Sequence, residues 1–174
     1  HARRLLDDER KIALELLEDL ATFDSVLIPY GGGGLTTGIA SALRALAPEV
    51  RVYAVEPETG APVAATLAAG GEPTSVEYRA SFVDGAGSRS VLPRMWELVR
   101  PLLAGSHVVS IAEAAAAIRV LAERTSVIAE GAGALAVAAA LSGRAGSGRI
   151  VCIVSGGNID ASRLAAIFAG RTPE

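Results

Sequence analysis

The chain has 174 residues, a formal net charge of −3, and a composition that is 51% hydrophobic. This length suits one domain with its own core, and the acidic balance argues against nucleic acid or an anionic membrane as a partner. No apolar run approaches the ~20 residues of a membrane span. The single cysteine, Cys152, excludes an intramolecular disulfide and fits a reducing compartment. We therefore expect a cytoplasmic protein.

Strand-like and helix-like segments alternate along the sequence. A first helix carries Ile12 and Leu16 on one face, and apolar runs predict strands over 25–29, 51–56, 107–109 and 150–154. Helices are predicted over 35–47, 63–69, 91–103, 131–141 and 161–170, and Ser110 and Glu113 form the capping-box pattern S-x-x-E. This alternation predicts an α/β fold: a doubly wound, mostly parallel sheet with helices on both faces.

Four consecutive glycines follow the first predicted strand and precede a predicted helix: Gly31, Gly32, Gly33 and Gly34. Glycine lets the backbone approach an anion closely, and the N–H groups and dipole of the next helix favour negative charge. Ile39 follows Gly38 where a Walker A turn needs lysine, and the pattern G-x-G-x-x-G fits no register here. The turn therefore predicts a phosphate site outside the common nucleotide fingerprints, although a plain flexible turn also fits.

A second glycine turn, with the sequence SGGN over 155–158, follows the last predicted strand. In open parallel sheets, ligands bind beyond the carboxyl ends of the strands. Both glycine turns lie at such ends, so we expect them to face one site.

Five short motifs occur in order: GGGGL (31–35), VEP (55–57), DG (84–85), EGAGA (130–134) and VSGGN (154–158). Together they resemble the C-terminal half of threonine/serine dehydratases, which belong to the fold type II family of pyridoxal-phosphate enzymes with tryptophan synthase β. The resemblance covers about residues 8–160. It implies that residues 1–174 form the C-terminal cofactor-binding portion of a tryptophan synthase β-like enzyme, without the N-terminal half of the family fold.

The resemblance implies pyridoxal 5'-phosphate as cofactor. It places the phosphate on the turn of four glycines with Leu35 opening the helix, and the pyridine nitrogen on Ser155. It also places Glu130 close to the ring and the backbone of Gly85 along the pocket. From the residues alone, Ser155 also fits an N-cap of the last helix, Glu130 a first-turn acid and Gly85 an ordinary turn.

Glu56 has two interpretations. In relatives such as serine racemase, a glutamate at this place binds a divalent cation beside a backbone carbonyl and a later acid. Gly60 matches the carbonyl, but the later acid falls on Pro62, which cannot be a ligand, and an oxygen cage needs several such groups. The sequence favours Glu56 as an ordinary acid at the end of a strand over Glu56 and Gly60 as metal ligands.

The family's lysine forms a Schiff base with the cofactor and lies in the N-terminal part of the subunit, in a Ser-Phe-Lys type motif. This sequence has no such motif. Its only lysine, Lys11, lies in the charged run 8–11 of a predicted surface helix, so no catalytic residue is expected within this chain. If the end of this sequence is natural, no regulatory domain follows the last predicted helix, and a short, catabolic-type dehydratase is expected.

The resemblance implies an ammonia-lyase that eliminates water from threonine or serine to give a 2-oxo acid and ammonia. It also implies a small amino acid as substrate and a homo-oligomer, either a dimer or a tetramer. Alternatives are a racemase or β-replacement enzyme of the same family, a non-catalytic phosphate-binding or oligomerisation module, and a nucleotide-binding α/β domain with Glu56 as the ribose-binding acid.

Overall fold

The computed structural model describes residues 2–174, with side chains from residue 8 onward. The strands are β1 (Ser25–Pro29), β2 (Arg51–Pro57), β3 (Gly105–Val109) and β4 (Ile150–Cys152). The helices are α1 (Ala2–Asp19), α2 (Gly34–Leu46), α3 (Pro62–Ala68), α4 (Pro93–Val99), α5 (Ile111–Thr125), α6 (Gly131–Leu141) and α7 (Ala161–Phe168), with a 3-10 turn, η1 (Arg100–Leu102), after α4.

The four strands form one parallel sheet in the order β3-β2-β1-β4. In the register, Leu27 of β1 lies between Tyr53 of β2 and Cys152 of β4. The expected parallel α/β fold is confirmed. Because β1 and β4 are neighbours running in the same direction, the two glycine turns that follow them leave the sheet at the same edge.

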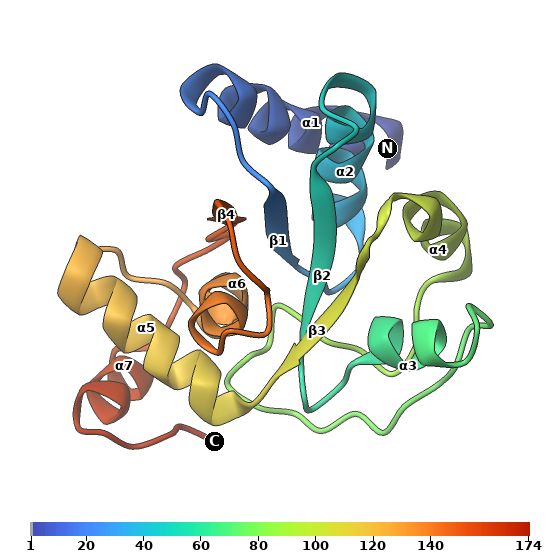
Figure 1. Ribbon diagram of the computed structural model, residues 1–174. Helices are drawn as coiled ribbons and strands as arrows, with labels where there is room; N and C mark the ends of the chain where they lie inside the picture. The colour runs from blue at the N-terminus through green and yellow to red at the C-terminus, as the bar shows by residue number, and fades with distance from the viewer. Residues whose placement is uncertain (1) are drawn as a thin grey trace.

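Helices cover both faces of the sheet (Figure 1). On one face α1 and α2 pack against Val26 and Ile28 of β1. On the other, α6 packs against the strands, α5 packs on α6 and α7 on α5, and the core of this layer includes Leu27 and Val55. Because α6 is built almost wholly of small apolar residues (GAGALAVAAAL), it can lie close to the strands and be buried on most sides. A third, smaller cluster joins Tyr30 to α3 and α4.

Three expectations about helix and strand ends can be compared with the structure. The capping box is confirmed: the Glu113 N–H donates to Ser110 Oγ at 3.2 Å, and the Ser110 N–H donates to Glu113 Oε2 at 2.7 Å. The last strand ends at Cys152, two residues earlier than predicted. Ser155 as the N-cap of the last helix is wrong, since Asp160 holds that position.

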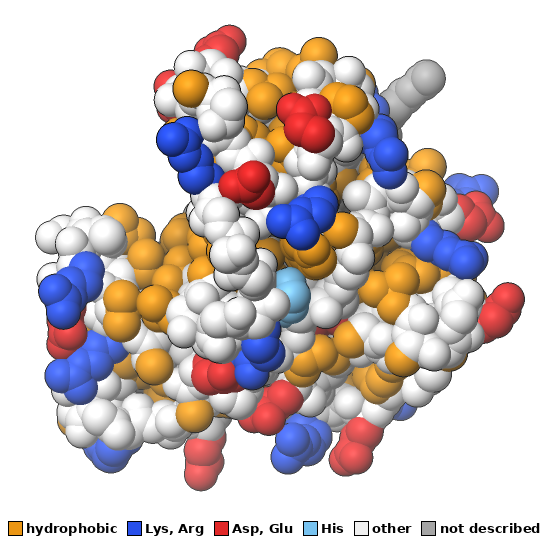
Figure 2. Space-filling model, in the orientation of Figure 1, with side chains coloured by type: hydrophobic (Ala, Val, Ile, Leu, Met, Phe, Trp, Pro, Cys, Tyr) orange, Lys and Arg blue, Asp and Glu red, His pale blue; other side chains and the backbone are white. Residues whose placement is uncertain are grey.

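Acidic and basic side chains are interspersed over the face drawn in Figure 2, without a broad patch of one sign. This distribution agrees with the small net charge and gives that face no electrostatic footprint for nucleic acid. Among residues 2–174, no helix combines the length and apolarity needed to span a bilayer.

Candidate cofactor site

One groove is lined by Leu35, which follows the four-glycine turn, and by Ser155, which begins the SGGN turn. Its volume is about 460 Å³. The other lining residues are Glu9, Ile12, Leu16, Val151, Cys152, Ile153 and Val154. Sites for small cofactors are typically concave and mostly apolar, with a few polar groups that fix orientation. The groove has this character, and it joins the predicted phosphate end to the predicted ring end.

The phosphate end is a helix N-terminus without a side-chain cap. Gly33 is the N-cap of α2, with φ 85° and ψ −2°, and no side chain accepts a hydrogen bond from the first turn. The first N–H groups of a helix have no partner within the helix, so here they remain free for an external anion. The positive end of the helix dipole adds to this preference.

The packing around the four-glycine turn differs from one glycine to the next. A Cβ atom at Gly31 would lie 2.9 Å from the Gly85 carbonyl oxygen, and one at Gly33 would lie 2.6 Å from Met95 Cγ. A Cβ at Gly32 would meet nothing within 4 Å. The turn is therefore tightly packed at Gly31 and Gly33 but open at Gly32. The open space at Gly32 leaves room for a phosphate group to approach the backbone.

Ser155 lies at the ring end of the groove. Its side chain is exposed, and among the described residues no group hydrogen-bonds to its hydroxyl. A free hydroxyl can donate to or accept from a heterocyclic nitrogen without carrying charge. The residue thus fits the role that the sequence predicted for it, and it has no competing structural task.

Glu130 holds the turn that carries Ser155. Its backbone N–H donates to the Gly156 carbonyl at 3.0 Å, and its Oε2 accepts from the Asn158 N–H at 3.1 Å. A Cβ at Gly156 would lie 2.6 Å from Glu130 Oε1. The carboxylate therefore packs directly against the SGGN turn, a contact that the sequence did not predict.

Gly85 connects the two ends of the site. A Cβ atom added to it would lie 3.3 Å from Glu130 Oε1, while its own carbonyl faces Gly31. Next to it, the Gly87 N–H donates to the Tyr30 carbonyl at 3.0 Å. The exposed Asp84–Gly85 turn thus lies against both the four-glycine turn and Glu130, but neither residue is among those that line the groove.

Glu56 is fully buried and bonds to the backbone of α3. Its two carboxylate oxygens accept from the N–H groups of Val63 at 2.8 Å and Ala64 at 2.9 Å, and from Ser106 Oγ at 2.8 Å. Burial raises its pKa, while these three hydrogen bonds act in the opposite direction. The Gly60 carbonyl accepts from the Ser88 N–H at 3.2 Å.

Glu56 thus behaves as the predicted acid at the end of a strand, and it satisfies the N-terminus of α3. The described residues contain no cluster of three or more His, Cys, Asp or Glu side chains that could hold a metal ion.

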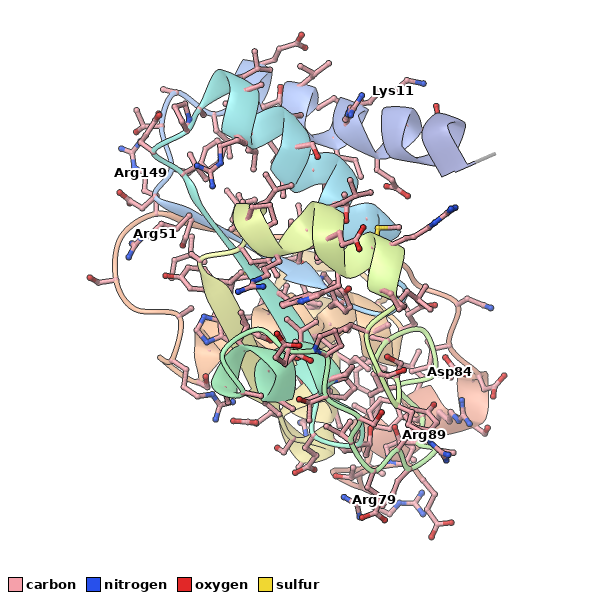
Figure 3. All side chains as sticks on the ribbon, turned by 90° about the vertical axis from the view of Figure 1, so that its right-hand side faces the viewer. Lys11, Arg51, Arg79, Asp84, Arg89 and Arg149 are labelled. Atoms are coloured by element: carbon pink, nitrogen blue, oxygen red, sulfur yellow. The ribbon has the colours of Figure 1, made fainter. Side chains whose placement is uncertain are left out.

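Lys11 lies on the outside of α1. Its Nζ forms an ion pair with Asp8 Oδ1 at 2.9 Å, and both side chains are about 70% exposed. The hydrogen bond and charge of Asp8 raise the pKa of Lys11. Figure 3 shows Lys11 at the top of the molecule and Asp84 near the bottom. The lysine is therefore the solvated charge that the sequence predicted and does not line the groove.

Three residues next to the four-glycine turn were not predicted to belong to the site: Tyr30, Thr37 and Met95. Tyr30 directly precedes the glycines, so its position at the strand end was a usable signal. Met95 lies about sixty residues later in an amphipathic segment, and nothing in the local sequence indicates that it contacts the turn.

Comparison with known proteins shows which family the chain belongs to. The model of the pyridoxal-phosphate dependent enzyme family matches residues 6–156. The catabolic L-threonine dehydratase TdcB of Escherichia coli strain K12 is 38% identical over 168 residues, which cover 94% of this chain and 51% of that protein. Thus the chain spans about half the length of this relative.

Among solved structures, a threonine deaminase from T.th. has a TM-score of 0.81 at 34% identity, covering 87% of this chain and 56% of that one. Maize serine racemase has a TM-score of 0.81 at 31% identity, covering 93% and 52%. With the match to the family model over most of its length, the chain belongs to the family of pyridoxal-phosphate-dependent enzymes.

Proposed function

We propose that residues 1–174 form the cofactor-binding part of a pyridoxal-phosphate-dependent ammonia-lyase. Its reaction removes water from threonine or serine and gives a 2-oxo acid and ammonia. The observation that carries the proposal is the single groove lined by both Leu35 and Ser155. The bound cofactor would supply an electron sink for the charge that develops at the substrate Cα, and the protein would supply orientation and electrostatics.

At the phosphate end, binding would rest on backbone alone. The N–H groups of Gly32, Gly33, Gly34 and Leu35 would hold the phosphate, and the dipole of α2 would favour its negative charge. Support comes from the uncapped N-terminus of α2 and from the open space in front of Gly32. Gly31 would contribute by letting the turn approach Gly85 closely.

At the ring end, the hydroxyl of Ser155 would hydrogen-bond the pyridine nitrogen. A hydroxyl is a neutral partner, so it would not enforce a protonated ring as a carboxylate would. This favours the elimination of a β-hydroxyl, which needs only a mild electron sink. Glu130 would keep the turn in place through Asn158, and the backbone of Gly85 would close the pocket wall.

Covalent attachment of the cofactor needs a lysine, and Lys11 does not have the position for it. Its ion pair with Asp8 on the exposed side of α1 leaves it as a solvated charge. We therefore assign the attachment, and the recognition of the substrate carboxylate, to residues outside these 174. A cytoplasmic location and a homo-oligomer, dimer or tetramer, complete the proposal by analogy with the family. A cation at Glu56 and Gly60 is disfavoured because the Glu56 carboxylate already accepts three hydrogen bonds.

A racemase is the second candidate, because maize serine racemase matches this chain with the same TM-score as a threonine deaminase. The two reactions share the cofactor site and differ in product. Chiral analysis of the remaining serine, run beside the ammonia assay, separates them.

The test is borohydride reduction of the protein purified from its native source with pyridoxal phosphate, followed by intact mass and peptide mapping. We expect a cofactor adduct on a lysine other than Lys11, and ammonia release from L-threonine or L-serine. Ser155→Ala should lower turnover about tenfold or more, since it removes a hydrogen bond of about 1–2 kcal/mol.

Ser162→Ala, at an exposed serine on α7, is the matched control and should behave like the wild type. A protein of only this length that forms no adduct and releases no ammonia would leave the non-catalytic module as the better description.

A further inference from the structure

The left-handed turn at Gly33 is enclosed by two side chains from outside the glycine motif. A Cβ atom at Gly33 would lie 2.6 Å from Met95 Cγ and 2.7 Å from the Tyr30 hydroxyl. Met95 belongs to α4, and Tyr30 is the residue that links β1 to the turn. Two side chains therefore pack closely against Gly33, whose φ is 85°.

Met95 also contacts the first turn of α2. The Thr37 hydroxyl donates to Met95 Sδ at 3.1 Å, and the Thr37 N–H donates to the Gly33 carbonyl at 2.9 Å. The methionine thus touches Gly33 at the start of this turn and Thr37 at its end. A flexible thioether fills irregular gaps of this kind well.

The position of Met95 differs from that of its neighbours on α4. Trp96 and Val99 are buried in the small cluster with Tyr30, and they account for the packing of α4 on the core. Met95 is only half-buried and lies outside the three buried clusters. Its described contacts are with the turn, so its side chain has a task separate from filling the core.

Tyr30 completes the enclosure. It is 1% exposed, and among the described residues its hydroxyl has no hydrogen-bond partner. Burial, with a smaller effect of the Glu56 charge, raises its pKa to about 12, so it stays neutral. Its backbone is fixed on both sides, because its N–H donates to the Val55 carbonyl at 2.9 Å and its carbonyl accepts from Gly87.

We infer that Met95 is a positioning residue for the cofactor phosphate, so that α4 sets the geometry of a turn that α4 does not belong to. This inference rests on the proposed function. The phosphate would be held only by backbone N–H groups, and the direction of each N–H depends on the φ and ψ of the turn. A side chain that holds the backbone of Gly33 in place therefore influences the affinity for the phosphate. Among the described contacts, Met95 meets both Gly33 and Thr37, the two ends of the first turn of α2.

The test compares Met95→Leu, which keeps the volume but loses the sulfur acceptor, with Met95→Ala, which loses both. Leu98→Ala, at an exposed leucine of the same helix, is the control. The dissociation constant for pyridoxal phosphate is followed through the fluorescence of the only tryptophan, Trp96, and the bound phosphate through its phosphorus resonance. Urea unfolding confirms that each variant is folded.

We expect Met95→Ala to raise the dissociation constant about tenfold or more, because small misplacements of binding groups cost affinity steeply, and to shift the phosphorus resonance. Met95→Leu should show a smaller effect, and Leu98→Ala none. Thr37→Val should add little to Met95→Leu in a double-mutant cycle, since both remove the same contact. A folded Met95→Ala protein with the wild-type constant and resonance would overturn the inference.

Amide hydrogen exchange at Thr37, whose N–H donates to the Gly33 carbonyl, measured without ligand, separates this inference from the proposed function. We expect faster exchange in Met95→Ala than in Leu98→Ala, whether or not the cofactor binds. If the wild type fails to bind pyridoxal phosphate, the proposed function is overturned and the phosphate part of the inference falls with it. Unchanged exchange beside normal wild-type binding would overturn the inference alone.

Discussion

The two glycine turns that flank the groove are held in different ways. The turn after β1 is wedged by close packing, with Gly31 against Gly85 and Gly33 against Met95. The turn after β4 is more exposed and is tied by one carboxylate, that of Glu130. Both turns exclude side chains, since a Cβ at Gly156 would lie 2.6 Å from Glu130 Oε1 and one at Gly157 would lie 2.5 Å from the Ile128 carbonyl oxygen. The second turn is held in addition by a carboxylate, so removal of that carboxylate should loosen the second turn and leave the first unchanged.

The largest effect is expected at Gly33. Gly33→Ala places a methyl group against Met95 and Tyr30 at a φ of 85°, so it should cost about 3 kcal/mol of unfolding free energy from strain and overpacking. Urea unfolding measures this. Gly32→Ala, which points a methyl group into open space, should stay within about 0.5 kcal/mol of the wild type. Equal costs for both variants would show that the turn is not wedged.

Glu130→Ala tests the second turn. It leaves the Asn158 N–H without its charged acceptor, and the expected loss is about 2 kcal/mol. Hydrogen exchange at the Asn158 amide should speed up, while exchange at the Thr37 amide, which donates to the Gly33 carbonyl, stays unchanged. Glu130→Gln keeps an oxygen acceptor and should recover part of the protection. An Asn158 amide that exchanges at the wild-type rate in Glu130→Ala would show that the Glu130 carboxylate does not hold this turn.

The capping box of α5 provides a second carboxylate for comparison, that of Glu113, which caps a helix N-terminus away from the groove. A hydrogen bond from Arg144 and those from Ser110 lower the pKa of Glu113. The folded state therefore favours the carboxylate, and its contribution is present above the unfolded pKa, near 4.3, and is lost as the pH falls through the lower folded value.

Glu113→Ala should cost about 1 kcal/mol of unfolding free energy at pH 7, because it removes the capping box that a glutamine would keep, and its difference from the wild type should shrink as the pH falls below about 4.3. Because Arg144 is 45% exposed, the ion pair adds little and the cap supplies most of the effect. Urea unfolding of both proteins across this pH range provides the check. A difference that does not shrink below about pH 4 would contradict the assignment.

Local sequence signals predicted the elements that depend on local physics. The range of α6 was predicted to the residue, because an unbroken run of small apolar residues follows Glu130. Ser110 and Glu113 were predicted to cap α5 because both partners lie in one turn. The last strand was predicted two residues too long, since Ile153 and Val154 are as apolar as the strand before them, but pairing with β1 ends at Cys152.

Contacts between distant segments could not be predicted. Glu56 was expected at a strand end, but its bond to Ser106 joins positions fifty residues apart. Met95 behind Gly33, and Glu130 against Asn158, depend likewise on how the helices pack over the sheet. The residues that we propose to face the cofactor carry motif signals, whereas the residues that hold them in place are brought there by the packing of distant segments.

The reactivity of the Cys152 thiol reports how often β4 opens. Burial raises the pKa of its thiol to about 11, and its Sγ lies 3.5 Å from the Ala136 carbonyl. Since only the thiolate reacts quickly, a thiol reagent would modify the intact protein slowly and mainly through moments when the strand detaches from β1. The rate of labelling would then measure how often β4 opens, and a ligand bound in the groove that Cys152 lines would lower that rate.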